Sequence, residues 1–257
     1  IDAVTRRVKE QTPVCDFISA GEVRNRVWVI SEESEVAVIR EAFAGIDRIY
    51  IADGHHRAAS AVRVGQKRRV ENPGYTGEEA FNFFLCILFP ESELKILDYN
   101  RVVKDLGGQS KAEILERLRP NFNIMPYRRN VARPSAKGEI GMYLDHSWFL
   151  LTAKNNVKSG DAVKGLDVSI LQDRVLAPVF GIENPRADAR IDFVGGIRGA
   201  EELMERADAS QGAAFLMFPT SIQELFRVAD AGKLMPPKST WFEPKLLSGL
   251  FLHSLKN

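Results

Sequence analysis

The sequence predicts an α+β fold, in which helices and strands follow one another without strict strand–helix–strand alternation. Capping-box signals at Ser110 and Ser221 each open a helix. Short apolar runs, such as residues 48–52 and 213–218, are typical of buried strands, which we expect to form a mixed sheet. The 257 residues are 45% hydrophobic and 27% charged, which is typical of a globular protein of one or two domains.

The N-terminal elements are predicted from apolar spacing and turn residues. Pro13 ends a first helix, and Gly21 separates two short strands. Glu32 and Glu33 favour a helix N-terminus, and Gly45 favours its end. The predicted helices cover residues 1–11, 31–45 and the stretch that continues past residue 57, and the predicted strands cover residues 14–19, 26–30 and 48–52.

The rest of the chain continues this mixture. Strands are predicted at 81–89, 94–103, 142–144, 148–152, 191–194, 213–218, 239–242 and 250–255, and helices at 110–118, 166–180, 200–207 and 221–231. The polar, glycine-containing stretch at residues 154–165 predicts a boundary between an N-terminal part, residues 1–160, and a C-terminal α+β subdomain, residues 161–257.

Charge and cysteine content exclude several classes of protein. The 35 Lys and Arg residues nearly balance the 34 Asp and Glu residues, so the chain as a whole is not expected to bind DNA. Cys15 and Cys86 lie far apart, which argues against a disulfide framework and favours a reducing, cytoplasmic setting. No apolar run approaches the ~18 residues of a membrane span, so no membrane association is expected.

The residues best suited to binding or catalysis gather in the turn at residues 53–57, between a predicted strand and a predicted helix. Gly54 allows a ligand to approach the backbone, and the first helical turn leaves about four N–H groups unpaired. Arg57 stands in that turn, where its guanidinium can bind a phosphate. These features together predict a phosphate-binding site at a helix N-terminus.

Three charged or titratable side chains of this turn leave several roles open. Asp53 would repel a phosphate unless it binds Mg²⁺, accepts a proton from a substrate hydroxyl, or only caps the helix. His55 and His56 are suited to proton transfer near neutral pH, but adjacent helical residues point about 100° apart, so at most one is expected to face the site. Common helix-cap chemistry is the competing explanation.

Four motifs in order resemble an uncharacterised prokaryotic family, the domain of unknown function DUF1015. They are A-D-G-H-H-R from Ala52, L-F-P from Leu88, L-x-I-L-D-Y-N-R-V-V from Leu94, and M-P-P-K-S-T-x-F-x-P-K from Met235. The strand–glycine-turn–helix core in turn looks like the ParB/sulfiredoxin superfamily, whose members hold nucleotide phosphates on such a turn. The resemblance therefore implies that the N-terminal part, residues 1–160, binds a nucleotide.

Within that superfamily, free serine kinases carry an Asp-Gly-His turn that is similar to Asp53-Gly54-His55. Sulfiredoxins place a cysteine there, so their chemistry is not expected. In the kinases a glutamate from an earlier segment acts as the base. Glu22 is one candidate for that role, and an acidic residue preceding Ile1 in a longer protein is another.

Two further motifs supply candidate binding residues. Lys238, Ser239 and Thr240 follow two prolines that stiffen the chain, so they are candidates for phosphate binding, with a solvated strand edge as the alternative. The motif D-Y-N-R provides Asp98, Asn100 and Arg101. These three are candidates for the amino and carboxylate ends of a substrate, and a simple turn is the alternative.

The leading hypothesis is a kinase-like phosphotransferase that uses ATP or ADP with Mg²⁺ and acts on a small hydroxyl metabolite such as free serine. In it Asp53, His55, His56 and Glu22 are the candidate catalytic residues. The first alternative is a non-catalytic nucleotide-sensing module of the ParB type. The second is a metal-dependent hydrolase built on Asp53 and one histidine, which ranks last because no clustered ligand motif is present.

Overall fold

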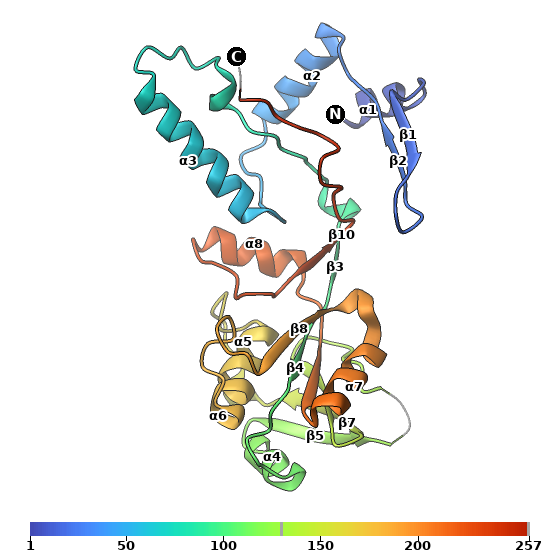
Figure 1. Ribbon diagram of the computed structural model, residues 1–257, viewed down its shortest axis with the longest axis vertical. Helices are drawn as coiled ribbons and strands as arrows, with labels where there is room; N and C mark the ends of the chain where they lie inside the picture. The colour runs from blue at the N-terminus through green and yellow to red at the C-terminus, as the bar shows by residue number, and fades with distance from the viewer. Residues whose placement is uncertain (129–130, 256–257) are drawn as a thin grey trace. The chain divides into compact units, whose positions relative to one another are not determined.

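The computed structural model describes residues 1–128 and 131–255, and the chain divides into two compact units, Ile1–Ile51 and Ala52–Asn257 (Figure 1). The first unit contains helix α1 (Asp2–Lys9), the antiparallel strands β1 (Cys15–Ile18) and β2 (Arg24–Val27), and helix α2 (Glu33–Ala44). The predicted helices and hairpin of this unit are therefore confirmed, with ends shifted by a few residues.

The second unit is built around a six-stranded sheet with the strand order β5-β7-β6-β9-β4-β8. Its strands are β4 (Tyr99–Val103), β5 (Phe122–Tyr127), β6 (Glu139–Leu144), β7 (Ser147–Ala153), β8 (Ile191–Gly195) and β9 (Ala213–Met217). Every pairing among the described residues is antiparallel, so the α+β class is confirmed with an antiparallel rather than a mixed sheet.

Both faces of this sheet are buried, and the alternation of side chains along each strand divides the core in two. Val102 and Leu216 pack with helix α7 (Gly199–Ser210), whereas Val103 and Phe215 pack on the opposite face. That second face is covered by α4 (Lys111–Leu118), α5 (Asp167–Leu171) and α6 (Ala177–Phe180), as Figure 1 shows. Burial on both faces explains why these strands are almost continuously apolar in sequence.

The two helix starts that the capping boxes predict are found in the structure. The side chains of Ser110 and Ser221 accept hydrogen bonds from the backbone N–H of Glu113 and Glu224, and both glutamates return the contact. These capping boxes open α4 and α8 (Ile222–Asp230) as predicted. A π-helical turn at Gln172–Leu176 joins α5 to α6, and short 3₁₀ turns lie at Ala80–Asn82, Glu91–Glu93, Asn155–Val157 and Gly196–Arg198.

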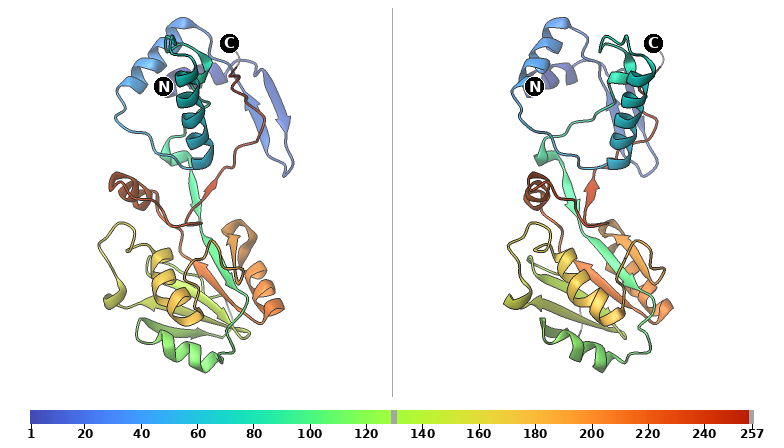
Figure 2. Two further views of the ribbon diagram at one scale, coloured as in Figure 1. Left: turned by 60° about the vertical axis from the view of Figure 1, so that its left-hand side comes forward. Right: turned by 90° about the vertical axis from the view of Figure 1, so that its left-hand side faces the viewer.

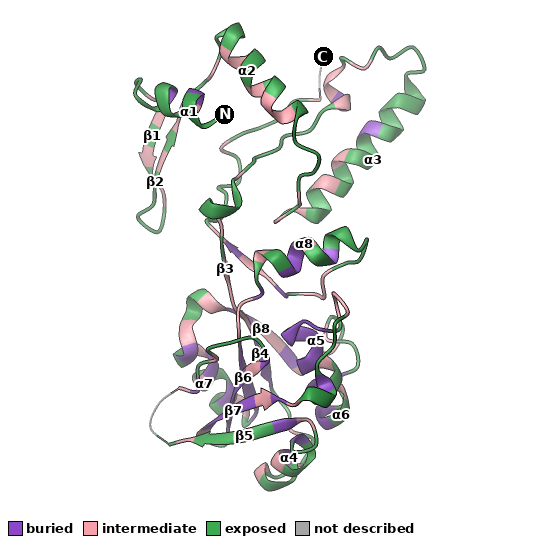
Figure 3. Cartoon of the chain, turned by 180° about the vertical axis from the view of Figure 1, so that it is seen from behind, coloured by how far each residue is buried: buried purple, intermediate pink, exposed green. Residues whose placement is uncertain are grey.

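A smaller pair of strands belongs to the same unit and connects two of the motifs. Strand β3 (Lys95–Leu97) pairs antiparallel with β10 (Trp241–Glu243), and both views of Figure 2 show them side by side, β3 in green and β10 in red. Helix α3 (His55–Glu71) also lies in this unit. Figure 3 shows that α3 is mostly exposed, while the buried residues concentrate in the six-stranded sheet and the helices on it.

Three predicted strands are wrong. Residues 48–52, 81–89 and 250–255 contain no strand, and Ala80–Asn82 is instead a 3₁₀ turn. Apolar and β-branched residues favour an extended chain, but a strand also needs a partner for its backbone groups. No strand among the described residues pairs with these three segments, and Ile49 and Phe83 remain more than half exposed.

The division of the chain differs from the predicted boundary after residue 160. The six-stranded sheet takes β4 to β7 from one side of that boundary and β8 and β9 from the other, and the two units separate after Ile51. The polar stretch at 154–165 is a surface connection between β7 and α5. Strands that are far apart in the sequence pair without a local sequence signal. The polar composition of residues 154–165 therefore predicted a boundary where the structure has only a connection within one sheet.

None of the described helices combines the length and the apolar character that crossing a membrane needs.

Lowering the pH is expected to strengthen the contribution of Asp167 to stability. Asp167 is buried at the start of α5, and its carboxylate accepts the backbone N–H of Gly138 at 2.9 and 3.0 Å. Burial raises the pKa of Asp167 to about 6. Because this pKa lies above the unfolded value, the contribution is fully present below about pH 4 and is lost as the pH rises through 6. Between pH 7 and pH 5 the gain is about 1 kcal/mol.

Urea unfolding of the wild type and Asp167→Asn at both pH values measures this gain, because the variant cannot titrate at the position. The unfolding free energy of the wild type minus that of the variant should rise by about 1 kcal/mol at pH 5. Asp105→Asn is the control, since exposed Asp105 also accepts a glycine N–H, at 2.8 Å. A difference that stays constant for Asp167→Asn would contradict the assignment.

Candidate functional site

The turn at residues 53–57 forms the N-terminus of α3 around a glycine in the left-handed region. Gly54 is the N-cap with φ 83°, a conformation that favours glycine. The carboxylate of Asp53 accepts the N–H of Gly54 at 2.8 Å, and the N–H of Ala58 donates to the carbonyl of Gly54 at 2.9 Å. The helix therefore starts at His55, directly after the turn, as the sequence predicted.

Two cations share one carboxylate oxygen at this helix end. Arg57 Nη2 lies 3.8 Å from Asp53 Oδ2, and Lys245 Nζ lies 3.7 Å from the same oxygen. The side chains of Asp53, Arg57 and Lys245 are 57%, 70% and 44% exposed, so solvent weakens both pairs. One negative and two positive charges leave an excess positive charge beside the helix N-terminus.

The backbone adds further donors at the same place. The N–H groups of His55, His56 and Arg57 belong to the first helical turn and have no partner among the described residues. The positive end of the helix dipole adds to the field of the two cations. The turn thus presents backbone donors, a guanidinium and an ammonium to one region of solvent, which is the chemistry that binds phosphate.

Lys245 was not among the predicted site residues. It is the last residue of the motif that starts at Met235, and it follows β10, whose pairing with β3 determines where this segment runs. Its ammonium also lies 5.0 Å from the ring centre of Trp241. Membership of that motif was the only sequence signal that pointed to Lys245.

The remaining predicted residues of this region are placed as follows. His55 and His56 are exposed and make no side-chain hydrogen bond or ion pair among the described residues. Glu22 lies in the β1–β2 turn with φ 60° and belongs to the other unit of the chain. The described residues contain no group of three His, Cys, Asp or Glu that could hold a metal ion. The structure thus offers Asp53 as a single carboxylate and no clustered ligand set.

The D-Y-N-R motif lies at the junction of β3 and β4, where its side chains are engaged within the protein. Asn100 is 0% exposed: its amide nitrogen donates to Asp98 at 2.5 Å, and its amide oxygen accepts the N–H of Met217 at 2.8 Å. The Asp98 carboxylate lies against Gly196, where a Cβ atom would come within 2.2 Å of it. Asn100 therefore joins β4, β9 and the Asp98 turn.

Arg101 is a buried cation. It is 4% exposed, donates to the carbonyl oxygens of Tyr99 and Lys238, the latter at 3.1 Å, and lies 5.5 Å from the ring centre of Phe193. Burial lowers the pKa of its guanidinium to about 10. Arg101 forms no ion pair within the described parts of the chain, and its contacts join the D-Y-N-R motif to the turn that contains Lys238.

The turn after the two prolines presents one of its three candidate side chains freely to solvent. Lys238 is exposed and its ammonium lies 5.6 Å from the ring centre of Tyr99. Ser239 is buried and its hydroxyl donates to the carbonyl of Pro236 at 2.5 Å. Thr240 is half-buried. The structure thus brings Arg101 and Lys238 together, and a chain of contacts through Tyr99 and Trp241 leads on to Lys245.

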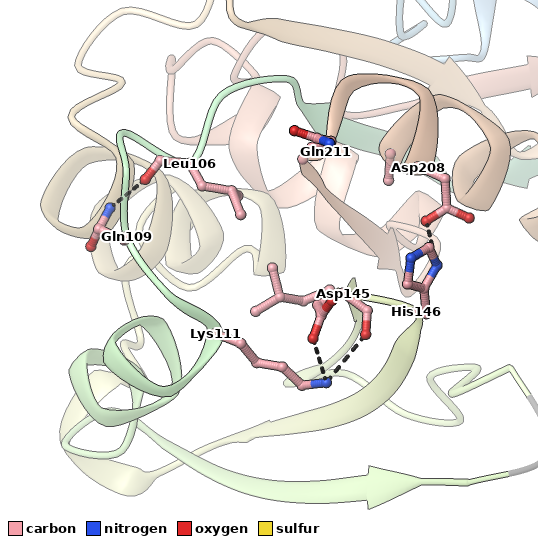
Figure 4. Close-up of a pocket in the computed structure, with 10 residues that line it drawn as sticks. Leu106, Gln109, Lys111, Asp145, His146, Asp208 and Gln211 are labelled. Carbon is pink, nitrogen blue, oxygen red and sulfur yellow. Dashed lines mark hydrogen bonds and ion pairs between the residues drawn. The ribbon is translucent and has the colours of Figure 1, made fainter.

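A separate cavity of about 330 Å³ lies between the β6–β7 turn, the segment that leads into α4 and the C-terminal end of α7, away from these motifs (Figure 4). Its charged side chains pair with one another: Lys111 lies 3.2 Å from Asp145, and His146 lies 3.2 Å from Asp208. Because the Lys111 ammonium pairs with Asp145 and the His146 ring contacts Asp208, the lining offers no unpaired cation with which to attract an anion.

The fold and these contacts define an α+β protein with an anion-suited helix N-terminus. Residues 1–169 match the family described as "Protein of unknown function (DUF1015)", and the chain belongs to this family. The resemblance of the sequence to this family is therefore confirmed. A comparison with curated proteins finds no match.

Three solved structures are similar at low identity. A free serine kinase in complex with AMP is 15% identical, covers 83% of this chain and 81% of its own, and has a TM-score of 0.40. A mutant of a free serine kinase in complex with ADP is 16% identical over the same shares, with a TM-score of 0.38. A conserved hypothetical protein from Pyrococcus furiosus is 16% identical over 77% and 71%, with a TM-score of 0.40.

Proposed function

We propose that this protein binds the phosphates of ATP or ADP at the N-terminus of α3 and transfers a phosphoryl group to the hydroxyl of a small metabolite such as free serine. One observation carries the proposal: Arg57 and Lys245 converge on Asp53 beside three unpaired backbone N–H groups. This is the donor set that a nucleotide phosphate chain requires.

The exposed ion pairs explain how phosphate would enter. The side chains of the two pairs, at 3.7–3.8 Å, are 44–70% exposed, so each pair contributes little to stability and is easily exchanged for a phosphate contact. A phosphate of charge about −2 competes well for two cations and the helix end, because hydrogen bonds between charged groups are about twice as strong as neutral ones. Asp53 holds Arg57 and Lys245 near the turn until the nucleotide takes them over.

Asp53 then lies beside the bound phosphates, and the proposal gives it one of two alternative roles. It accepts the proton of the acceptor hydroxyl, or it supplies the protein ligand for Mg²⁺. One carboxylate fits this ion, which in nucleotide sites keeps water and phosphate oxygens as its other ligands. When bound, Mg²⁺ supplies neutralisation of the phosphate charge. Either His55 or His56 stabilises developing charge, and Glu22 remains a candidate base.

Asp98, Asn100 and Arg101 enter the proposal around the acceptor. Asn100 holds the Asp98 carboxylate by the 2.5 Å hydrogen bond, and Asp98 is the member of the three that can meet an amino group. Arg101 is turned inward and acts by holding the backbone at Lys238. In the turn after the two prolines, Lys238 and Thr240 are the phosphate-binding candidates, because the buried Ser239 hydroxyl donates to the Pro236 carbonyl at 2.5 Å.

Nucleotide binding is expected to depend on Arg57 and Lys245. Each of Arg57→Ala and Lys245→Ala should weaken ADP binding about tenfold in isothermal titration, because each removes one charged contact to phosphate. Arg63→Ala is the matched control: it removes an exposed arginine from the same helix beyond the turn. Equal ADP affinity for Arg57→Ala and Arg63→Ala would reject the phosphate site.

The transfer step is tested on the same proteins with ATP or ADP, Mg²⁺ and serine, with phosphoserine detected by mass spectrometry. Wild-type protein should form phosphoserine, and Asp53→Asn should lose this activity by about 100-fold or more while it still binds ADP without Mg²⁺. Tight ADP binding by the wild type without any product would instead favour a non-catalytic nucleotide sensor.

A further inference from the structure

The cavity beside the β6–β7 turn brings together residues in a backbone conformation that favours glycine. Five described residues other than glycine have φ in the left-handed region, and three of them line this cavity: Asp145, His146 and Gln211. Asp145 and His146 form the two-residue turn between β6 and β7, where asparagine and glycine are the usual residues. Side chains that are kept in this conformation tend to gather at functional sites, so the cavity is a candidate ligand site.

The charged centre of the cavity is an ion pair between Lys111 and Asp145. Nζ of Lys111 lies 3.2 Å from Oδ2 of Asp145, and Figure 4 shows the two side chains pointing toward each other. The ammonium also donates to the carbonyl of Asp145 at 3.2 Å and to the hydroxyl of Ser147 at 2.9 Å. The side chains of Lys111 and Asp145 are 32% and 64% exposed. Both charges are therefore held in place and can be reached by a ligand.

The second pair of the cavity is engaged within the protein. Nδ1 of His146 lies 3.2 Å from Oδ1 of Asp208, and Oδ2 of Asp208 accepts the hydroxyl of Tyr143 at 3.0 Å. Both carboxylate oxygens of Asp208 thus have partners, which leaves the first pair as the charged group that a ligand would meet. The apolar part of the lining comes from Leu106, Leu144 and Ala207.

Two fixed opposite charges side by side distinguish ligands by their charge. A ligand with a single charge is attracted by one member of the pair and repelled by the other, 3.2 Å away, so the two effects nearly cancel. A zwitterion that lies antiparallel to the pair gains both attractions. In an α-amino acid the ammonium nitrogen and the carboxylate carbon are about 2.5 Å apart, which is close to the separation within the pair.

The size of the cavity agrees with a ligand of this kind. Its volume of about 330 Å³ is near the lower end of the roughly 300–1,000 Å³ of small-molecule sites. The apolar part of the lining can take an aliphatic side chain out of water while the charged groups of the ligand lie along the ion pair.

We propose that this cavity binds a free α-amino acid with an aliphatic side chain, whose carboxylate meets Lys111 and whose ammonium meets Asp145. The cavity lies past the end of β4 at Val103, whereas the D-Y-N-R motif lies at the start of that strand. It is thus a second site, separate from the one at the N-terminus of α3, and it does not depend on the function proposed above.

The test compares three probes of nearly the same shape in isothermal titration with the full chain. L-Leucine carries both charges, isopentylamine lacks the carboxylate, and isocaproate lacks the ammonium. Wild-type protein should bind L-leucine about tenfold or more tightly than either of the others, because only the zwitterion makes a charged contact to each member of the pair.

Removing either charge of the pair should change the preferred probe. Lys111→Met leaves Asp145 without its cation, so this variant should bind isopentylamine at least as tightly as L-leucine. Asp145→Asn leaves the ammonium alone, so this variant should bind isocaproate at least as tightly as L-leucine. Asparagine suits the left-handed region, so the second variant keeps the turn and should unfold within about 3 °C of the wild-type Tm.

Lys154→Met is the matched control. Lys154 also donates to a backbone carbonyl, that of Arg119 at 2.6 Å, but it lies outside the cavity lining, so this variant should keep the wild-type preference for L-leucine. Failure of the wild type to bind L-leucine, equal wild-type affinity for the three probes, or an unchanged preference in Asp145→Asn overturns the assignment. Titration with ADP tests the phosphate site separately, so the failure of one proposal is distinguished from the failure of the other.

Discussion

Gly141→Ala is expected to destabilise the protein by more than about 3 kcal/mol, because no space exists for a methyl group at this position. Gly141 lies in the middle of β6, and a Cβ atom there would come 2.1 Å from the carbonyl oxygen of Ala132 and 3.2 Å from Cβ of Leu216. The first contact is with backbone, so a rotamer change cannot relieve it. The segment around Ala132 must move away from the sheet, which opens the core that it covers.

Thermal unfolding measures this effect against Gly160→Ala. Gly160 is exposed, and a Cβ atom there would meet nothing within 4 Å. We expect the Tm of Gly141→Ala to fall by about 10 °C or the variant to be insoluble, while that of Gly160→Ala stays within about 2 °C of the wild type. Similar Tm values for the two variants would show that the Ala132 segment does not cover β6 as described.

Asn100→Leu is expected to cost about 3 kcal/mol, although leucine has the same number and branching of side-chain heavy atoms as asparagine. The substitution leaves the buried N–H of Met217 without its acceptor and removes the donor that holds the Asp98 carboxylate. The first loss costs about 1–3 kcal/mol, and the second frees the Asp98 turn between β3 and β4.

Urea unfolding of Asn100→Leu is compared with Asn123→Leu, which places the same change on an exposed position of β5. The control should change the unfolding free energy by less than about 0.5 kcal/mol. An Asn100 variant as stable as the control would mean that its two hydrogen bonds are not formed in solution.

The candidate site divides into a part that its own sequence specifies and a part that it does not. Gly54, Asp53 and Arg57 lie within one turn of chain, so the helix start, the cap and the guanidinium could be predicted from local chemistry. Lys245 reaches Asp53 only because β10 pairs with β3. Nothing local to Lys245 distinguishes it from other exposed lysines.

The D-Y-N-R motif shows the same division. Its polar residues were predicted to contact a substrate. The sequence does not show that the Asn100 side chain accepts the N–H of Met217, 117 positions away, or that the Arg101 guanidinium donates to the carbonyl of Lys238. Polar side chains look alike in sequence whether they face solvent or satisfy buried backbone groups. Only the packed sheet determines which groups need a partner.

The sequence by itself determined the α+β class, the capping boxes at Ser110 and Ser221, and the anion-suited turn at Gly54, because each depends on contacts within a few residues. The tertiary structure alone decided the strand order, the meeting of Asp53 with Lys245, and the absence of strands at residues 48–52 and 81–89. A strand or an ion pair exists only where a distant segment supplies the other half, and that depends on how the whole chain packs.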